Sequence, residues 1–472
     1  MTEKLFHVAT APFEAARRVS IRPEGHRSRR LHGHSFLARV RAELPAGWAP
    51  FAGSEAGALK ADLERCVASL DYCDLNEHLP VPTDENLGRW VHKSLQAPGI
   101  ESVGIQSTPD QGVDLDCSER VHLWRRFHFE AAHRLPNVPE GHKCGRMHGH
   151  GFEVILHATQ DLGGRDMGVD FDHLGDLWTP LHTELDFTCL NNIPGLENPT
   201  SEMLSAWLWA RIQPVLPSLS WISVYETATA GCHYDGEHYR IWKEQRFESA
   251  LRLVKAPDGN PRRRLHGHSY LLRLYLTAPL DRVMGWTLDY GDVKELFRPV
   301  YRQLDHHLLN ELPRLGDADP ASLVLWMREE AATRLPQIDR IDLYETPGCG
   351  AVLSWGGSLA PPFLHDLQGS GIPPSFCLGS PAREPSPGIK AGEKVRPSYF
   401  CGTIVEASGS EREGAQGRAT DVEDGLEAVG GPQRARLLGT LSTSSSTFAT
   451  PLLTMPRSLA ARRDRSMTRP FA

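Results

Sequence analysis

Three versions of one short phrase constrain this chain more than any other feature of its sequence. The phrases are LHGHSF at Leu31–Phe36, MHGHGF at Met147–Phe152 and LHGHSY at Leu265–Tyr270, which lie 116 and 118 residues apart. A second phrase follows each at a nearly constant distance, as LDYCDLN from Leu70, LDFTCLN from Leu185 and LDHHLLN from Leu304. Phrases that recur in the same order and at the same spacing indicate internal repeats. The sequence therefore predicts three copies of one unit of about 115–120 residues.

Each copy is predicted to be an α+β unit, and the middle copy shows the pattern best. Alternating polarity predicts strands at Arg126–Ala132 and Phe152–Thr159, and closing strands at Trp221–Glu226 and His238–Trp242. Apolar residues at helical intervals predict helices at Asp172–Leu185 and Ser201–Leu216. A four-stranded antiparallel sheet with two helices on one face leaves its edges unpaired. Three fused units can pair those edges with each other, so we expect one closed barrel.

Four segments follow from this interpretation. We expect repeat 1 at residues 1–120, repeat 2 at 121–243, repeat 3 at 244–360 and a disordered tail at 361–472. The tail is rich in Pro, Gly, Ser and Arg and has no periodic apolar pattern, so it cannot bury enough surface to offset chain entropy. Its Cys377 and Cys401 belong to no motif and receive no role.

Composition narrows the classes of partner. The net charge of −8 gives no reason to expect a nucleic-acid partner. No apolar run approaches the roughly 20 residues of a membrane helix, and the N-terminus lacks the apolar core of a secretory signal. The nine cysteines form no regular framework, which is typical of reduced thiols. We therefore expect a cytoplasmic protein with neither a nucleic-acid nor a membrane partner.

The repeat 2 phrase carries the pattern of a metal site. His148 and His150 flank one glycine, and alternate residues of a strand face the same way, so both imidazoles share a face. His133 lies fifteen positions earlier and can return through the intervening loop. Three imidazoles leave the fourth tetrahedral position of zinc open, which is the catalytic arrangement. The sequence predicts one Zn²⁺ per chain on His133, His148 and His150.

Longer stretches of repeat 2 resemble a known family. The segments FEAAHRLPNVPEGHKCGRMHGH, LNNIPGLENPTSE and ETATAGCHY resemble the 6-pyruvoyltetrahydropterin synthase/6-carboxytetrahydropterin synthase family, and most of all its bacterial carboxy-type members. The resemblance is strong across Arg126–Trp242, partial in repeats 1 and 3 and absent from the tail. It implies the T-fold, in which single units form trimeric twelve-stranded barrels, commonly stacked in pairs. Three fused units would form one pseudo-trimer, and two chains a homodimer.

The resemblance also implies an activity. The family reaction is a zinc-dependent carbon–carbon lyase step that converts 7,8-dihydroneopterin triphosphate to 6-carboxy-5,6,7,8-tetrahydropterin. It releases acetaldehyde and triphosphate and supplies the queuosine or 7-deazapurine precursor pathway. Two alternatives stay open: the related pyruvoyl-type synthase activity, and a non-catalytic protein that binds pterin or zinc.

Roles for individual residues follow from the same resemblance. Cys144 would move protons, and its neighbours Lys143 and Arg146 are expected to favour the thiolate. Glu226 would anchor the pterin by accepting two hydrogen bonds from it. The other substrate-binding positions are Thr200, Ser201 and, in repeat 3, Glu345 as the fallback anchor.

Repeats 1 and 3 depart from the family pattern. Arg17 and Ser28 stand in repeat 1 where a zinc histidine and the cysteine are expected, and Leu251 and Arg262 stand there in repeat 3. Gln106 replaces the anchoring glutamate in repeat 1. Two histidines without a third make a weak site, so only repeat 2 is expected to bind zinc well. The loop arginines are Arg27, Arg29 and Arg30 in repeat 1 and Arg262–Arg264 in repeat 3. They could hold a triphosphate, since guanidinium groups match phosphate geometry, but loop charge or ion pairs are the favoured interpretation.

The proton relay is split between copies. The family's Asp-His pair is Asp186-Phe187 in repeat 2 and Asp71-Tyr72 in repeat 1, whereas repeat 3 retains it as Asp305-His306. In the family this pair reaches the active site from a neighbouring unit. We therefore expect one composite site per chain, with zinc and Cys144 from repeat 2 and Asp305 and His306 from repeat 3.

Overall fold

A computed structural model of the chain describes residues 3–356 and 361–363. All of these residues belong to one compact unit, Met1–Ser380. The predicted tail, with Cys377 and Cys401, lies outside the described residues apart from 361–363.

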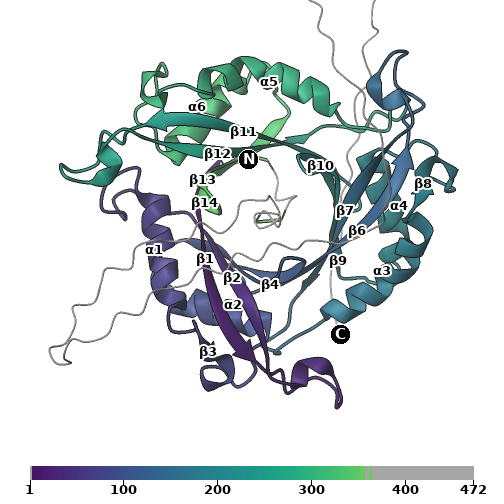
Figure 1. Cartoon of the computed structure of the whole chain (residues 1–472), viewed down its shortest axis with the longest axis horizontal. Helices are drawn as coiled ribbons and strands as arrows, with labels where there is room; N and C mark the ends of the chain where they lie inside the picture. The colour runs from purple at the N-terminus through teal and green to yellow at the C-terminus, as the bar shows by residue number, and fades with distance from the viewer. Residues whose placement is uncertain (1–2, 357–360, 364–472) are drawn as a thin grey trace, which may run out of the picture. The chain divides into compact units, whose positions relative to one another are not determined.

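The described residues form a closed antiparallel barrel, in which twelve strands follow one another around the ring (Figure 1). The strands of the ring are β1 (Lys4–Arg17), β2 (His32–Ala42), β4 (Ile100–Thr108), β5 (Gln111–Asp116), β6 (Val121–His133), β7 (His148–Gln160), β9 (Leu219–Thr227), β10 (Ala230–Tyr234), β11 (Tyr239–Leu251), β12 (His266–Thr277), β13 (Ile338–Thr346) and β14 (Cys349–Ser354). Antiparallel pairing of β1 with β14, from Lys4↔Ser354 to Val8↔Gly350, closes it. Two-residue strands β3 (Cys73–Asp74) and β8 (Thr188–Cys189) pair in parallel with β1 and β6.

Two helices per repeat cover the outer face of the barrel (Figure 1). They are α1 (Glu55–Val67) and α2 (Asp84–Ser94), α3 (Phe171–Leu185) and α4 (Ser201–Ile212), and α5 (Tyr290–Leu304) and α6 (Pro320–Ala331). The second helix of each pair begins at the same N-cap position, where Thr83, Thr200 or Asp319 accepts a hydrogen bond from a backbone N–H three residues on. Short 3₁₀ turns at Arg27–Arg29, Lys143–Gly145 and Pro261–Arg263 interrupt the long loop after the first strand of each repeat.

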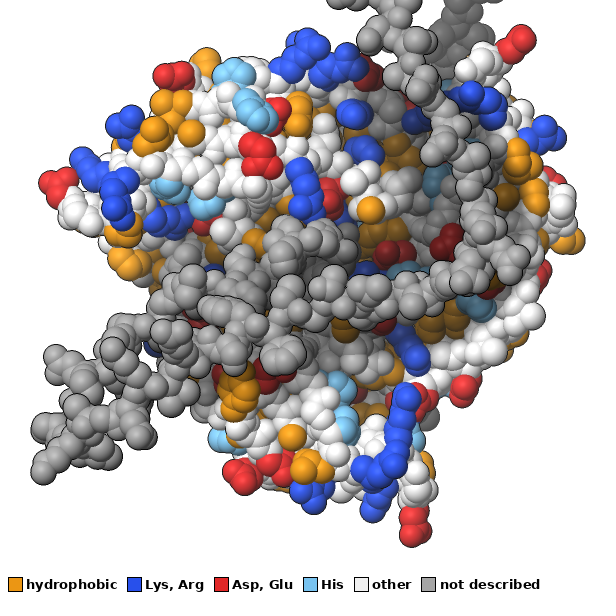
Figure 2. All heavy atoms as spheres, viewed as in Figure 1, with side chains coloured by type: hydrophobic (Ala, Val, Ile, Leu, Met, Phe, Trp, Pro, Cys, Tyr) orange, Lys and Arg blue, Asp and Glu red, His pale blue; other side chains and the backbone are white. Residues whose placement is uncertain are grey.

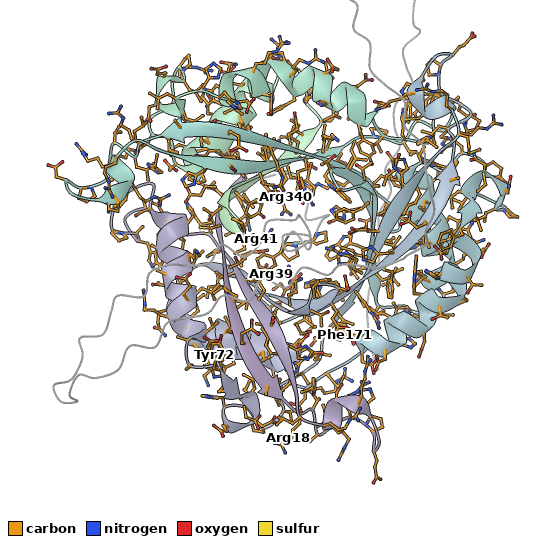
Figure 3. The ribbon with its side chains drawn as sticks, in the orientation of Figure 1. Arg18, Arg39, Arg41, Tyr72, Phe171 and Arg340 are labelled. Atoms are coloured by element: carbon orange, nitrogen blue, oxygen red, sulfur yellow. The ribbon has the colours of Figure 1, made fainter. Side chains whose placement is uncertain are left out.

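The inner face of the barrel is packed with arginine and aromatic side chains rather than left hollow. Arg39, Arg273 and Arg340 are almost fully buried, and each pairs with a carboxylate, on Asp114, Glu244 and Asp342, at 2.7, 2.7 and 2.6 Å. Figure 3 shows Arg39 and Arg340 near the centre of the ring. Pairing offsets the cost of burying these charges.

The first residues of the predicted tail also lie inside the ring. The Pro361 carbonyl accepts a hydrogen bond from Arg340 at 2.9 Å, and Phe363 is 3% exposed beneath the Arg39 guanidinium. Residues 361–363 therefore belong to the packed interior, contrary to the expectation that disorder begins at residue 361.

The structure confirms the predicted α+β class, the three repeats and the closed barrel. The strand expected at His238–Trp242 is the first part of a longer strand, β11 (Tyr239–Leu251). It pairs with β10 over residues 239–243 and with β12 from Arg240 to Leu251, so it begins repeat 3 rather than closing repeat 2. The second strand of the closing hairpin is β10, which the sequence pattern did not predict. Among the described residues, no helix has the length and apolarity needed to cross a membrane.

Replacement of Gly231 by alanine should destabilise the barrel. A Cβ at Gly231 would lie 2.2 Å from the Val224 carbonyl oxygen and 2.3 Å from the Trp242 ring, and neither group can move away easily. Overpacking of this kind costs about 3 kcal/mol. Chemical denaturation should show this loss for Gly231→Ala, whereas Gly316→Ala, where a Cβ meets open space, should change stability by less than about 0.5 kcal/mol. Equal stability of the two variants would contradict the packing described here.

Candidate metal centre and active site

Three histidines converge where β6 and β7 meet their connecting loop. The register pairs His133 with His148 and Ala131 with His150, so both strands direct their imidazoles to one face. The ring centroids lie 4.5 Å apart for His133–His148, 5.1 Å for His133–His150 and 5.0 Å for His148–His150. The predicted facial set of three therefore forms.

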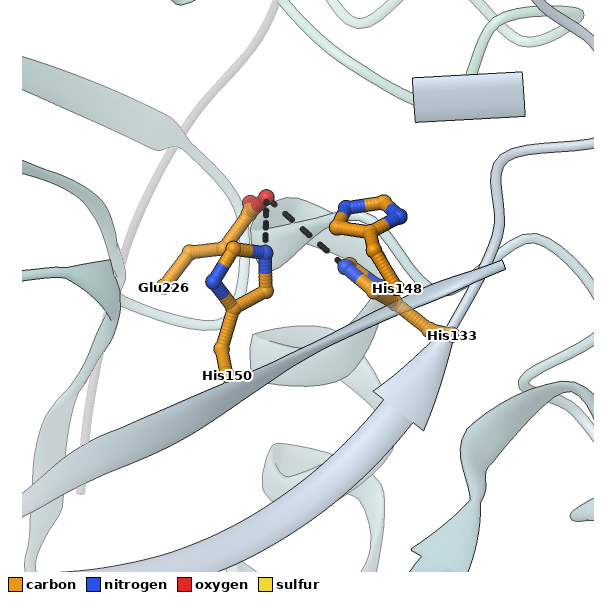
Figure 4. Close-up of side chains that lie close together, drawn as sticks. All are labelled: His133, His148, His150 and Glu226. Atoms are coloured by element: carbon orange, nitrogen blue, oxygen red, sulfur yellow. Dashed lines mark ion pairs between the residues drawn. The ribbon is translucent and has the colours of Figure 1, made fainter. Parts of the chain in front are cut away.

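A carboxylate joins the three imidazoles from the neighbouring strand. Glu226, near the end of β9, places Oε1 3.6 Å from Nε2 of His150 and 3.9 Å from Nε2 of His133 (Figure 4). One potential ligand atom from each of the four residues lies within 4.8 Å of the others, and the described residues contain no second group of this kind. Ligands of a tetrahedral zinc at 2.0–2.1 Å lie about 3.3 Å apart, so modest side-chain movement would suffice to enclose an ion.

The protonation of the histidines also suits a metal. Nδ1 of His133 lies 3.0 Å from the Pro199 carbonyl oxygen and Nδ1 of His148 lies 2.8 Å from that of Arg146, which leaves Nε2 as the lone-pair nitrogen of each ring. Nε2 of His133 and of His150 is buried without a hydrogen-bond partner. Burial lowers the pKa of His133 to about 4 and lowers the pKa of His150 as well. Neutral imidazoles with unpartnered Nε2 atoms fit a divalent cation.

Glu226 and Cys144 complete the pocket. Burial, with a contribution from the nearby Glu202 charge, raises the pKa of Glu226 to about 7, and the Ser201 hydroxyl lies 3.4 Å from its Oε2. Cys144 lies on the 3₁₀ turn Lys143–Gly145, and burial followed by the Glu226 charge raises the pKa of its thiol. Lys143 acts in the opposite direction but does not prevail. The flanking cations alone therefore do not favour the thiolate, contrary to the sequence-based expectation.

Repeat 3 closes this pocket through the segment before α5, which the sequence did not predict to take part. Asp289, the N-cap of α5, lies 3.4 Å from His142, and the Tyr290 hydroxyl lies 2.7 Å from that of Ser201. The Thr287 backbone N–H donates to Glu202 at 2.8 Å. The signal that could have marked this segment is a phrase shared by two repeats, VDFDHL at Val169–Leu174 and LDYGDV at Leu288–Val293, which places Asp170 and Asp289 at equivalent helix N-caps.

The predicted relay lies elsewhere. Asp305 accepts a hydrogen bond from the Glu248 backbone N–H at 3.1 Å, and the His306 N–H donates to the Glu248 carbonyl at 2.7 Å, which holds the pair beside β11 of its own repeat. His306 is 76% exposed and makes no hydrogen bond or ion pair with Cys144 or the three ligand histidines. The loops that end the β6–β7 and β11–β12 hairpins lie at different corners of the barrel (Figure 1). One chain therefore does not bring Asp305 and His306 to the histidine cluster.

Comparisons with known proteins identify the family to which this chain belongs. A profile of the family described as 6-pyruvoyl tetrahydropterin synthase matches the chain three times, at residues 8–116, 122–237 and 240–354. The chain belongs to this family. It is similar to a 6-carboxy-5,6,7,8-tetrahydropterin synthase of Synechocystis sp., at 39% identity over 119 residues that make up 24% of this chain and 91% of the relative.

More distant relatives extend the comparison. The chain is 27% identical over 94 residues, 19% of its length, to a dihydroneopterin monophosphate aldolase of Pyrococcus furiosus, of which the match covers 79%. Among solved structures, a 6-pyruvoyl tetrahydropterin synthase of Caenorhabditis elegans is matched over 94% of its chain and 25% of this one, at 20% identity and a TM-score of 0.23. Each such match spans about one repeat.

In repeat 1 a guanidinium takes the place of the first histidine of the family cluster. The register pairs Arg17 with His32, as it pairs His133 with His148, so the two positions are equivalent. Nη1 of Arg17 donates to the Pro82 carbonyl at 3.0 Å and lies 2.6 Å from Asp84, while Nη2 lies 3.4 Å from His34. A fixed positive charge among these groups opposes the binding of a metal cation.

In repeat 3 a different guanidinium fills the equivalent pocket. Arg262, at the position of Cys144, donates to both oxygens of Glu345 at 2.7 and 2.9 Å. His268 lies 3.9 Å from the same carboxylate, and burial lowers its pKa to about 4. The fallback anchor Glu345 is therefore already paired within its own repeat. These two replacements agree with the prediction that repeat 2 alone retains a metal centre.

Removal of the repeat 3 guanidinium should cost stability. Glu345 is 5% exposed, and Arg262→Ala would leave its carboxylate without its bidentate partner. Breaking such a pair costs about 3 kcal/mol. The matched control is Arg264→Ala, which removes an exposed guanidinium from the same loop and should change stability by less than about 1 kcal/mol. Urea denaturation of both variants tests this, and an Arg262→Ala protein as stable as the control would overturn the assignment.

Proposed function

We propose that the chain is a zinc-dependent 6-carboxytetrahydropterin synthase. It would convert 7,8-dihydroneopterin triphosphate and one water to 6-carboxy-5,6,7,8-tetrahydropterin, acetaldehyde and triphosphate, and so supply a queuosine or 7-deazapurine precursor pathway. The observation that carries this proposal is the convergence of His133, His148, His150 and Glu226 around one point, with Cys144 in the loop between the two strands. The repeat that holds this group is also the one most like the family's bacterial carboxy-type members.

Zinc is the metal that the donor set favours. Three neutral imidazoles with an open fourth position are the pattern of catalytic zinc sites. Bound zinc would act as a Lewis acid that polarises oxygen atoms of the substrate side chain.

The protein's own groups would bind and orient the pterin. The Glu226 carboxylate can accept two hydrogen bonds from the 2-amino and ring N–H groups of a pterin, which fixes its orientation. The hydroxyls of Ser201 and Tyr290, 2.7 Å apart, form a polar wall beside this carboxylate. Thr200 holds the start of α4 by accepting the Met203 N–H at 3.1 Å, which keeps Ser201 in place.

Cys144 is the residue we assign to proton transfer. Its Sγ would take up and return a proton at the substrate side chain, as a general base and then a general acid. Because burial raises the pKa of this thiol, deprotonation would depend on positive charge brought by the bound metal and on Lys143.

The relay pair would come from a second copy of the chain. The His306 side chain is 76% exposed, so a second barrel stacked on the first could receive it. We propose a homodimer in which Asp305 and His306 of one barrel serve the repeat 2 centre of its partner.

Turnover tests the activity directly. The zinc-loaded protein should release acetaldehyde from 7,8-dihydroneopterin triphosphate, and Cys144→Ala should lower kcat on the order of 10²–10⁴-fold, the usual contribution of a general acid or base. Cys117→Ser, which changes an exposed thiol, is the matched control and should retain full activity. A product that retains the carbon fragment would identify the pyruvoyl-type activity instead. Zinc binding without turnover would identify a non-catalytic binding protein.

Mixing of two inactive variants tests the relay. Cys144→Ala and His306→Ala should each be nearly inactive alone, because each lacks one half of every site. When the two are unfolded, mixed and refolded together, heterodimers should regain up to about half of the wild-type activity per heterodimer, since one of the two sites is then complete. Full activity of His306→Ala on its own would contradict this arrangement.

A further inference from the structure

A second cavity lies at the boundary between repeats 2 and 3, next to the metal centre. It has a volume of about 430 Å³ and lies between the β9–β10 turn at Thr229, the exposed edge of β11 and one side of α5. The Glu244 N–H donates to the Thr229 carbonyl at 2.8 Å, and beyond that bond the Tyr301 hydroxyl donates to the Arg246 carbonyl at 2.9 Å. The cavity is the gap left where β10 ends and no other strand covers β11.

The walls of this cavity are strongly basic. Its cationic lining residues are Lys243, Arg246, Lys294, Arg298 and Arg302. The last three recur every fourth residue along one side of α5, and Figure 2 shows Lys and Arg side chains gathered over this helix. Like charges four residues apart destabilise a helix, so helix stability does not account for the stripe.

Several acidic groups offset part of this charge. Glu244 lines the cavity, and its carboxylate is 2.7 Å from the buried guanidinium of Arg273. Glu244 also pairs with Arg246 at 3.8 Å, and Glu226 lies close enough to affect the pKa of Lys243. Asp305 and Glu248 affect the pKa of the lining residue Tyr301.

The stripe on α5 is itself mostly unpaired. Glu295 forms an ion pair with Arg298 on the surface of the helix. Neither Lys294 nor Arg302 forms an ion pair with any other residue that the structure describes. The lining of the cavity therefore keeps a net positive charge.

The equivalent gap between repeats 1 and 2 lacks the basic stripe on its helix, although Arg125 and Arg126 stand there in place of Lys243 and Glu244. It is recognised by the same backbone hydrogen bond, from the Arg126 N–H to the Asp110 carbonyl at 2.7 Å. There the Asp110 carboxylate lies 3.7 Å from His128 and introduces negative charge. The α3 positions that correspond to the stripe on α5 are Gly175, Thr179 and Thr183.

The gap between repeats 3 and 1 lacks the stripe as well, because Lys60, Glu64 and Ala68 stand at the corresponding positions and Lys60 pairs with Glu64. There the hairpin turn at Pro347 faces Thr10, whose hydroxyl lies 3.4 Å from the proline carbonyl. Among the described residues, the basic stripe thus occurs only at the boundary that carries the metal centre. A general need of the fold for positive charge would have placed it at all three.

The basic cavity adjoins the metal centre. Thr229 follows Glu226 by three residues, and Nζ of Lys243 donates to the Thr229 hydroxyl at 3.0 Å. Burial and the neighbouring charges of Lys294 and Lys143 lower the pKa of Lys243. Lys143 precedes Cys144, so one field of positive charge extends from the catalytic loop to α5.

We propose that this cavity binds the triphosphate of the substrate, with Lys294, Arg298 and Arg302 as its recognition residues. The inference rests on the proposed function and names the groups that hold its leaving polyphosphate. Guanidinium and ammonium groups suit a chain of phosphates because each oxygen can accept a charge-assisted hydrogen bond. The same chemistry would accept free triphosphate as a product.

Binding of inorganic tripolyphosphate to the metal-free protein tests the cavity apart from catalysis. Calorimetric titration should give a Kd that rises about tenfold or more in Arg298→Gln/Arg302→Gln, because two charge-assisted contacts are lost. Lys60→Gln/Arg65→Gln removes two charges from the exposed side of α1 and should leave the Kd unchanged within about twofold. Equal weakening in both double variants, or in neither, would overturn the proposal.

Kinetics then distinguish this proposal from the proposed function. In Arg298→Gln/Arg302→Gln the KM for 7,8-dihydroneopterin triphosphate should rise about tenfold while kcat changes little, and inhibition by dihydroneopterin without phosphates should be unaffected. A wild-type protein that binds tripolyphosphate at these arginines but turns over no pterin would refute the activity and retain the polyphosphate site. If the wild-type protein turns over the pterin and the double variant has the same KM, the polyphosphate site alone is refuted.

Discussion

The pairing of β1 with β14 is the contact on which the rest of this structure depends. An open sheet of this size would expose two edge strands with unpaired backbone groups. Here the first strand of repeat 1 meets the last strand of repeat 3, so one chain satisfies every edge of the ring. A fused ring differs from a ring of identical units in one respect. Its three interfaces are encoded separately, so each can change without changing the other two.

The pockets at the three interfaces between repeats differ from one another, as separate encoding allows. Each keeps a His-Gly-His pair, yet a different group lies beside that pair. In repeat 1 it is the Arg17 guanidinium on Asp84, and in repeat 3 it is the Arg262 guanidinium on Glu345. In repeat 2 it is the third imidazole, His133. Its Nε2 is buried without a hydrogen-bond partner, as is Nε2 of His150 and, in repeat 3, Nε2 of His266 and of His268. A buried polar pocket needs its charges paired, and two of the three achieve this with an internal arginine. The third, that of repeat 2, leaves room for a cation.

The sequence predicted those features that follow from the two-residue periodicity of strands and from the constant spacing of the repeated phrases. Equivalence of Arg17, His133 and Leu251 followed from the repeat spacing, and the strand register confirms it. The sequence did not predict which way His306 faces, because the turn that holds it has no periodicity of its own. It also did not predict that Tyr290 contacts Ser201 or that Lys243 lines the basic cavity, since both arrangements depend on the contact between two repeats. The thiol of Cys144 shows a third limit, because burial outweighs the flanking charges that the sequence displays.

The central claim is that one of three similar pockets binds a metal. Anomalous diffraction at the zinc edge, from crystals of the full chain grown with Zn²⁺, tests it most directly. The account predicts one strong peak per chain, enclosed by His133, His148 and His150. A peak of similar height beside His32 and His34, or beside His266 and His268, would contradict it, because Arg17 and Arg262 would then not exclude a cation. Absence of a peak at His133 would contradict it as well.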